Sequence, residues 1–271
     1  MPNPSQGFTG PRSYDEEIGP YTFGPFAQEL AGCLPQGFGG DVLELACGTG
    51  LVTRALRGRM APGARLVATD LSPAMLAYAR EQLQGEAIEW READALRLPF
   101  DDASFDALAC GFGLMFLPDR AAALREWRRV LRPGGRLLLT AWDRIEDNPH
   151  ALVFAQLIES MFPGDPEMKF RTPYELADGA ALDRLLAEAG FDERKIETRR
   201  IAIRDADPAR MASGQIRGTP RGALIAARGV ALDDMVVRVA RALAAQGGDP
   251  YQGYGQALVV QAITSRARTP P

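Results

Sequence analysis

Apolar runs of strand length alternate with runs of helix length between residues 41 and 142, and this alternation restricts the fold more than any other feature. We expect five strands and three helices here, the strands at 41–47, 64–70, 87–94, 104–113 and 136–142 and the helices at 51–59, 71–83 and 119–135. Strands that alternate with helices form a parallel sheet covered on both faces. An α/β fold is therefore expected, and 271 residues, 46% of them hydrophobic, are enough for one large domain with an added cap.

The pattern changes after residue 142. Further strands are expected at 195–204 and 255–267, and the helical segment between them predicts an insertion or cap over a substrate pocket. Asn148 is the expected cap of one helix, and Thr172 with Glu175 forms the capping box expected to start another. The predicted parts are a mobile N-terminus with lid helices, a core, the insertion, and a last strand with a tail, at residues 1–34, 35–204, 205–250 and 251–271.

The stretch "LELACGTGLVTRAL", residues 43–56, predicts a strand, a glycine turn and a helix. Gly48 and Gly50 allow the backbone to approach a ligand closely, and the start of the helix offers free N–H groups. A dinucleotide fingerprint has a third glycine where this chain has Thr53, and a phosphate-binding loop has a lysine where this chain has Leu51. The turn is therefore better suited to an uncharged or zwitterionic cofactor body than to phosphate.

Acidic side chains lie in or directly after the first three strands. Glu44 lies within the first strand, where a carboxylate can hold an ammonium group. Asp70 ends the second strand and can accept hydrogen bonds from both hydroxyls of a ribose. Asp94 follows the third strand and can accept the amine of adenine, while the backbone N–H of Ala95 reaches a ring nitrogen. Ammonium, ribose and adenine without phosphate describe S-adenosylmethionine.

Four stretches in succession, "VLELACGTG", "ATDLSPAMLAYAR", "READALRLPFDDASFDALACGFGLMFLPD" and "EWRRVLRPGGRLLLTAW", resemble the motifs of class I S-adenosylmethionine-dependent methyltransferases. The similarity covers about residues 35–145 and is closest to the group with a type 11 methyltransferase domain. It implies a Rossmann-like, seven-stranded, mostly parallel sheet whose last strand is antiparallel, with helices on both faces and a helical insertion.

The resemblance also implies a set of cofactor-binding residues. They are Glu44, Ala46, Gly48 and Gly50 at the methionine end, Asp70, Leu71 and Met75 at the ribose, Asp94 and Ala95 at the adenine, and Gly111 and Phe112 near the methyl group. Tyr14, in the N-terminal lid, is expected to close over the cofactor. Purely structural roles remain open for Leu71, Met75 and Asp94, as packing, core and turn residues respectively.

The sulfonium methyl group is already activated, so transfer depends on positioning and needs a base only if the acceptor must lose a proton. His150, the only histidine, and Tyr21 are the candidate catalytic residues; a plain surface histidine is the alternative for His150. The run "CGFGLMF" after the fourth strand lacks the Asn/Asp-Pro-Pro-Tyr/Phe pattern of enzymes that methylate amino groups of nucleobases or glutamine. It also lacks a carboxylate for a metal, so we expect no metal.

A small-molecule acceptor, methylated at oxygen, nitrogen or carbon, is the leading interpretation. Several aromatic residues are expected to line its pocket together with the 205–250 insertion: Tyr21, Phe112, Phe116, Trp142 and Phe154. Arginines of the insertion leave open a carboxylate, phosphate or carrier-bound acceptor. The competing hypotheses are a peptide methyltransferase, a catalytically silent methyltransferase-like partner protein, and a nicotinamide-dependent oxidoreductase.

The overall charge and the cysteines bear on partners and location. The formal net charge is −4 and the pI about 5.3, which disfavours a nucleic-acid partner. Three widely spaced cysteines, without a CxxC pair, are typical of reduced thiols in the cytoplasm. We find no signal-peptide core and no apolar run of membrane-spanning length, so we expect a cytoplasmic protein without a membrane partner, with a homodimer left open.

Overall fold

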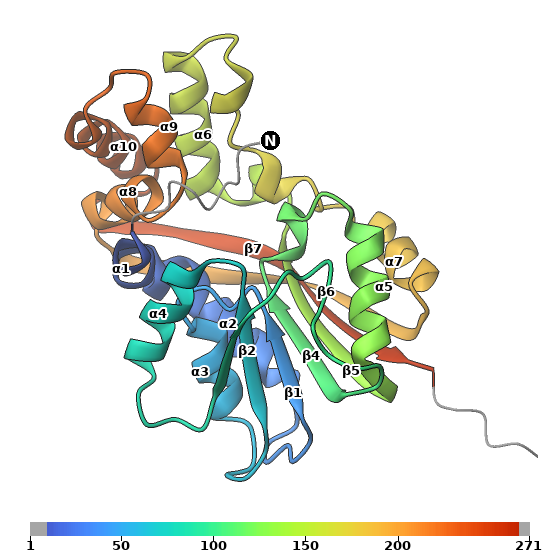
Figure 1. Ribbon diagram of the computed structural model, residues 1–271. Helices are drawn as coiled ribbons and strands as arrows, with labels where there is room; N and C mark the ends of the chain where they lie inside the picture. The colour runs from blue at the N-terminus through green and yellow to red at the C-terminus, as the bar shows by residue number, and fades with distance from the viewer. Residues whose placement is uncertain (1–9, 266–271) are drawn as a thin grey trace, which may run out of the picture. The chain divides into compact units, whose positions relative to one another are not determined.

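A seven-stranded sheet is the main element of the computed structural model, which describes residues 10–265 (Figure 1). The strand order is β3-β2-β1-β4-β5-β7-β6, with six strands parallel and β7 antiparallel to β5. This confirms the predicted fold class. The strands are β1 Val42–Leu45, β2 Leu66–Asp70, β3 Glu89–Glu92, β4 Phe105–Gly111, β5 Leu131–Trp142, β6 Phe191–Ala206 and β7 Tyr251–Thr264.

Helices connect the strands along the whole described chain (Figure 1). The first group surrounds β1 to β5 in the sequence: α1 Pro11–Ser13, the π-helix η1 Tyr14–Phe23, α2 Gly24–Gly32, α3 Leu51–Arg57, α4 Pro73–Gln82, η2 Leu114–Phe116 and α5 Arg120–Val130. The second group follows β5: η3 Ile145–Asp147, α6 Pro149–Met161, η4 Pro166–Met168, η5 Thr172–Tyr174, α7 Gly179–Glu188, α8 Pro208–Arg217, α9 Arg221–Ala226 and α10 Leu232–Gly247. Helices α8 to α10 lie between β6 and β7, in the range where the insertion is predicted.

Strand β1 is buried at each of its four positions. Because successive side chains of a strand point to opposite faces, both faces of the sheet are covered here. Helices α2 and α3 pack on the face that carries Val42, in a cluster with Leu30, Leu56, Ala107 and Leu138. Glu44 lies two residues after Val42 and therefore shares that face.

The chain divides into two compact units, which we treat separately. The sheet unit comprises Phe26–Asp143, Pro173–Arg199 and Ala257–Pro271, and the helical unit comprises Met1–Pro25, Arg144–Thr172 and Arg200–Gln256. Strands β6 and β7 contribute residues to both units. The helical unit has an apolar core of its own, which includes Phe154, Ile158, Met211, Met235, Leu243 and Tyr251. The predicted mobility of the N-terminus falls largely on residues 1–9, which lie outside the described residues.

The two predicted helix caps are wrong in their contacts. Helix α7 begins at Gly179 and is capped by Asp178, whose carboxylate accepts hydrogen bonds from the backbone of Ala180 and Ala181. The predicted capping box at Thr172 lies instead in the short helix η5.

Asn148 stands at the N-cap position of α6, but its side chain does not cap the helix. Its Oδ1 accepts a hydrogen bond from the backbone N–H of Gln256 at 2.9 Å, and its Nδ2 donates to the carbonyl of Gln256 at 3.0 Å. The side chain therefore ties the start of α6 to β7 within the helical unit.

Candidate cofactor site

The glycine turn after β1 has left-handed backbone at three positions, with φ of 51° at Ala46, 55° at Gly48 and 89° at Gly50. A methyl group added to Gly48 would meet no other atom within 4 Å, whereas one added to Gly50 would lie 3.0 Å from Leu83. Gly50 is therefore required by packing, and Gly48 faces open space. Ala46 is an exposed non-glycine residue in a strained conformation, which is a common property of functional loops.

The turn after β4 lies beside this glycine turn. Phe112 also has left-handed backbone, with φ of 56°, and a Cβ on Gly113 would come within 2.9 Å of the Cβ of Ala46. Strands β1 and β4 are neighbours, and the order of the strands reverses between them. Ligands of open α/β sheets bind at this reversal, beyond the carboxyl ends of the strands. The sheet therefore places Gly48, Gly111 and Phe112 where a cofactor is expected.

Asp70, the last residue of β2, holds the glycine turn in place. Its Oδ2 accepts a hydrogen bond from the backbone N–H of Gly48 at 2.8 Å, and its Oδ1 accepts one from Ser72 at 2.8 Å. Burial raises the pKa of Asp70, and the hydrogen bonds from Ser72 and Gly48 partly oppose this rise. Each carboxylate oxygen can still accept a second hydrogen bond, so the predicted contact with the ribose remains compatible with the geometry.

Glu44 is a buried acid without a counter-charge in its immediate surroundings. Its side chain is 1% exposed, and among the described residues its Oε2 has no hydrogen-bond partner. Burial raises the pKa of Glu44 from 4.5 to about 8, with Thr53 lowering it and Asp70 raising it further. A buried acceptor of this kind beside an open glycine turn fits an arriving ammonium group.

The predicted adenine residues lie after β3. Asp94 is exposed, and its Oδ1 accepts a hydrogen bond from the backbone of Leu96 at 2.9 Å, which is the geometry of a turn residue. The carbonyl of Ala95 accepts a hydrogen bond from Nε1 of the fully buried Trp127 at 2.9 Å. Trp127 thus anchors this turn. We did not predict that contact, although a tryptophan on the apolar stripe of a helix is a signal for such an anchor.

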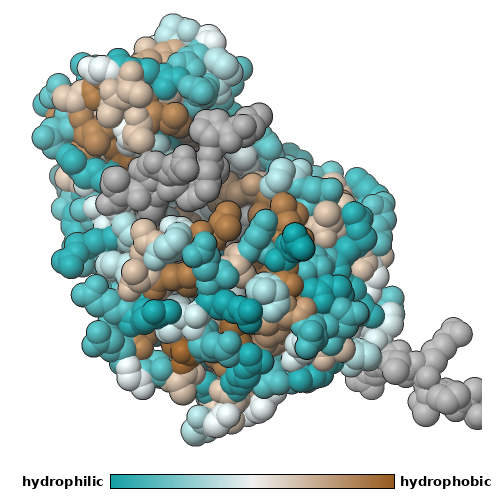
Figure 2. All heavy atoms as spheres, in the orientation of Figure 1, coloured by the Kyte–Doolittle hydropathy of each residue, from teal (hydrophilic) through white to brown (hydrophobic). Residues whose placement is uncertain are grey.

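Two further predicted residues follow β2. Leu71 is 51% exposed, which is unusual for a large apolar side chain, and Met75 is half-buried on α4. On the face drawn in Figure 2, hydrophilic residues predominate over the sheet unit, with apolar patches between them. An exposed leucine directly after Asp70 is consistent with a contact to a ligand, and its role stays a prediction.

Aromatic side chains gather at the carboxyl ends of β4 and β5. The rings of Phe112 and Trp142 stack with centroids 4.2 Å apart, and Phe26 contacts both rings edge-on at 5.7 and 5.4 Å. Tyr174 lies 6.2 Å from Trp142. This cluster gives the sheet unit an apolar wall at the edge where the glycine turn lies.

Phe116, predicted to line the acceptor pocket, is 60% exposed in the sheet unit, and three other predicted residues belong to the helical unit. Tyr14 stacks on Phe23 with centroids 4.8 Å apart, and Tyr21 packs against the core of that unit. His150 is 2% exposed, and its Nδ1 lies 3.3 Å from the carbonyl of Tyr254. Since a carbonyl only accepts, Nδ1 must carry the proton. Roles of these three residues at the cofactor or in catalysis remain predictions.

His150→Asn is expected to make the protein less sensitive to acid. Burial lowers the pKa of His150 from 6.5 to about 4, so the fold is stabilised above the ordinary pKa and loses this contribution as the pH falls toward 4. The lost contribution is about 2–3 kcal/mol between pH 7 and 4.5. Urea unfolding at both pH values should show this loss in the wild type only. An unchanged acid sensitivity in the variant, together with a large fall in turnover, would instead support a catalytic role.

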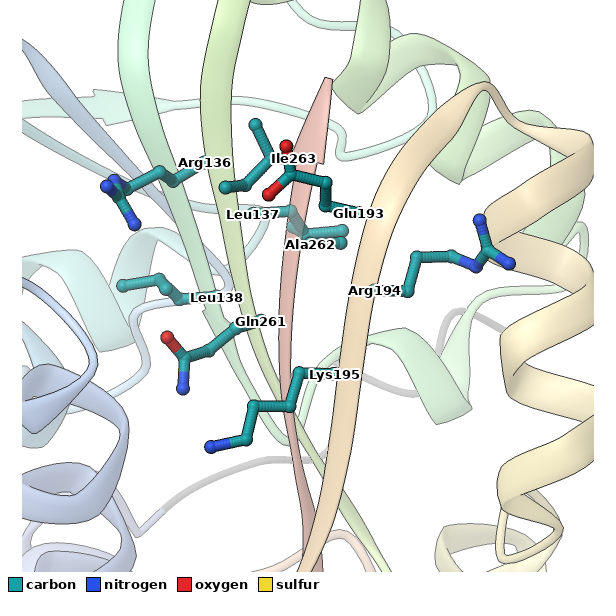
Figure 3. A pocket seen from close by; sticks show the side chains of 9 residues that line it. All are labelled: Arg136, Leu137, Leu138, Glu193, Arg194, Lys195, Gln261, Ala262 and Ile263. Carbon is teal, nitrogen blue, oxygen red and sulfur yellow. The ribbon is translucent and has the colours of Figure 1, made fainter. Parts of the chain in front are cut away.

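A separate hollow of about 280 Å³ lies among the last three strands of the sheet unit (Figure 3). It is lined by residues in the middle of β5, at the start of β6 and at the end of β7: Arg136, Leu137, Leu138, Glu193, Arg194, Lys195, Gln261, Ala262 and Ile263. The hollow lies beside β5, β7 and β6, which are separated from β1 and its glycine turn by β4. It is therefore not the candidate cofactor site.

Residues 10–265 contain neither a group of metal-binding side chains nor a membrane-spanning helix. Within this range, no three or more His, Cys, Asp or Glu side chains are grouped so that they could hold a metal ion. No helix in the same range combines the length and apolar character needed to cross a bilayer. That the reaction needs no metal stays a prediction.

The sequence matches a family model described as a methyltransferase domain over residues 43–139. The demethylmenaquinone methyltransferase of Thermus thermophilus is 41% identical over 124 residues, which are 45% of this chain and 56% of that protein. The ubiquinone/menaquinone biosynthesis C-methyltransferase UbiE of Pseudomonas savastanoi is 32% identical over 182 residues, covering 62% of this chain and 70% of that protein. The chain belongs to the class I S-adenosylmethionine-dependent methyltransferases.

A solved structure agrees on the fold. Phosphoethanolamine N-methyltransferase 2 of Haemonchus contortus, in complex with S-adenosyl-L-methionine, superposes with a TM-score of 0.62 at 18% identity. The match covers 95% of this chain and 57% of that one. The chain spans about half the length of several curated relatives that it matches. The acceptors of those relatives therefore do not identify the acceptor of this chain.

Proposed function

We propose that this protein transfers the methyl group of S-adenosylmethionine to a small, flat, largely apolar acceptor. The observation that carries the proposal is the turn at Gly48, which has open space on one side, is fixed by Asp70, and lies beside the unpaired Oε2 of Glu44. Membership in the methyltransferase family supports the same cofactor.

The residues of the sheet unit have distinct proposed roles toward the cofactor. Glu44 accepts the ammonium group, the open backbone at Gly48 takes the methionine chain, and Asp70 accepts from the ribose hydroxyls. Asp94 and the backbone of Ala95 hold the adenine. These donors and acceptors match an adenosyl amino acid and leave no cation for a pyrophosphate at the turn, which argues against the nicotinamide alternative.

Bound S-adenosylmethionine supplies a sulfonium methyl group that needs no further activation. With that group bound, a bond would form between the acceptor atom and the methyl carbon while the S–C bond breaks and its electron pair stays on sulfur. The protein contributes fixed geometry and exclusion of water, and the stacked rings of Phe112 and Trp142 supply an apolar, sterically rigid wall. A proton lost from the acceptor goes to a base, for which Tyr21 and His150 are the candidates, or to water.

The acceptor class follows from the apolar wall and from the relatives. Two of them carry names of quinone-pathway methyltransferases, so reduced, demethylated quinones are the first acceptors to test. The protein, S-adenosylmethionine and a demethylated naphthoquinol should yield S-adenosylhomocysteine and a singly methylated product by mass spectrometry. Peptides, carrier-bound acyl groups and small amines serve as competing acceptors. The proposal would be contradicted if no S-adenosylhomocysteine forms with any of these acceptors while NAD(P)H is oxidised.

A further inference from the structure

Unpaired polar atoms are concentrated beside the glycine turn. Among the described residues, Glu44 Oε2, Thr49 Oγ1 and Thr53 Oγ1 are buried without a hydrogen-bond partner, and the three residues are 1%, 2% and 0% exposed. Buried polar atoms are nearly always paired, because an unpaired one loses its bonds to water without replacement. The presence of three such atoms beside one turn indicates that they have a functional role.

Thr53 is the neighbouring residue that lowers the pKa of Glu44. It lies in α3, directly after the turn, and its Oγ1 would be 3.7 Å from a Cβ on Gly50. The side chain and backbone of Thr53 both favour the ionised form of Glu44 and lower its pKa, although Oγ1 does not make a hydrogen bond of normal geometry. The hydroxyl of Thr53 therefore lies close to the carboxyl of Glu44 without a regular hydrogen bond between them.

Burial is the main cause of the raised pKa of Glu44, and a nearby carboxyl adds to it. Asp70 from β2 raises the pKa of Glu44. Burial raises the pKa of the thiols of Cys47 in the turn and Cys110 of β4, and Glu44 and Asp70 add to this rise. In the free protein, burial and Asp70 together outweigh Thr53 and favour the neutral form of this carboxyl, and a cation from outside would favour the ionised form.

We propose that Glu44 is neutral in the free protein, releases its proton when the ammonium group of the cofactor binds, and is then held in place by the hydroxyl of Thr53. This rests on the proposed function, because the ammonium group belongs to S-adenosylmethionine. The proton passes to solvent, and Thr53 donates to the carboxylate as a positioning residue. Since only the ionised carboxyl binds the ammonium, affinity must rise with pH until Glu44 ionises by itself.

Calorimetric titration with S-adenosylhomocysteine tests the proton release. Between pH 5.5 and 7 the ligand ammonium stays protonated, so the Kd of the wild type should fall about tenfold per pH unit. Titrations in two buffers of different ionisation enthalpy should show about one proton released per ligand bound. Glu44→Gln should bind more weakly, release no proton and show a flat pH profile. A slope that persists in Glu44→Gln would overturn the inference.

Variants of Thr53 test its role. Thr53→Val removes the hydroxyl at nearly constant shape and should weaken binding about 5- to 20-fold and extend the pH dependence of the Kd to higher pH, because Thr53 lowers the pKa of Glu44, whereas Thr53→Ser should behave as the wild type. Thr53→Ala serves in the same way if the valine variant does not fold. Thr140→Val is the matched control, since Thr140 is another buried threonine with an unpaired Oγ1 and should leave the pH profile unchanged.

Two failures have different meanings. Binding of S-adenosylhomocysteine without proton release would overturn this inference and leave the proposed function intact. A wild-type protein that does not bind S-adenosylhomocysteine at all would overturn the proposed function and the inference with it.

Discussion

Gly48→Val is expected to weaken S-adenosylhomocysteine binding by at least about 100-fold while the protein stays folded. Gly48 has a φ of 55°, and the space on its Cβ side is empty within 4 Å. A branched side chain fills the volume proposed for the methionine end of the cofactor. The left-handed backbone adds strain of about 1–3 kcal/mol, which lowers the melting temperature without unfolding the protein.

Gly85→Val is the matched control for this strain. Gly85 has a φ of 86°, is exposed, and likewise has no atom within 4 Å of a built Cβ, but it lies in the loop between α4 and β3. We expect a similar loss in melting temperature and an unchanged Kd. Equal weakening of ligand binding in both variants would show that strain, rather than occupation of the turn, is responsible.

Asp70→Ala is expected to abolish measurable cofactor binding and to destabilise the protein by about 2–4 kcal/mol. The carboxylate accepts hydrogen bonds from Gly48 and Ser72, so its removal leaves two backbone N–H groups without this partner and releases the glycine turn. The proposed ribose contacts are lost at the same time. Titration calorimetry gives the change in Kd, and urea unfolding gives the change in stability.

Two further variants separate the structural and ligand effects of Asp70. Asp70→Asn keeps one acceptor oxygen and should lie between the wild type and Asp70→Ala in both measurements. Asp106→Ala removes a carboxylate that accepts hydrogen bonds from the backbone of Asp41 and from Arg132, at the start of β4. It should lower stability to a similar degree with no change in Kd. Loss of cofactor binding in Asp106→Ala would contradict the specific role of Asp70.

The parallel sheet and the glycine turn were predictable because their signals are local. Each strand is a short apolar run, and each parallel strand from β1 to β4 is followed by turn residues at the same edge of the sheet. Asp70 could therefore be assigned to the turn from its position at the end of β2. Its two backbone hydrogen bonds could not be predicted, because they depend on how the turns after β1 and β2 meet in space.

Thr53 shows how a pattern can be read too narrowly. In the sequence it counted only as the missing third glycine of a dinucleotide fingerprint. In the structure it is fully buried and influences the ionisation of Glu44, a relation that depends on how α3 packs on β1. Burial of this kind is a tertiary property, and no spacing rule reports it.

The burial of His150 could not be predicted either, because it also depends on tertiary packing. Its position near the start of α6 is compatible with an exposed ring, but the structure buries it against the carbonyl of Tyr254. Asn148 bonds to Gln256, 108 residues away in the chain, instead of capping its own helix. Glu175, predicted to complete a capping box with Thr172, instead pairs with Arg120 in the sheet unit.

Competitive binding of S-adenosylhomocysteine and NADH tests the central claim most directly, since it asks which cofactor the turn at Gly48 holds. The account predicts saturable, one-to-one binding of S-adenosylhomocysteine that is lost in Gly48→Val and is unaffected by excess NADH. Saturable binding of NADH that Gly48→Val removes, with no heat from S-adenosylhomocysteine, would contradict it.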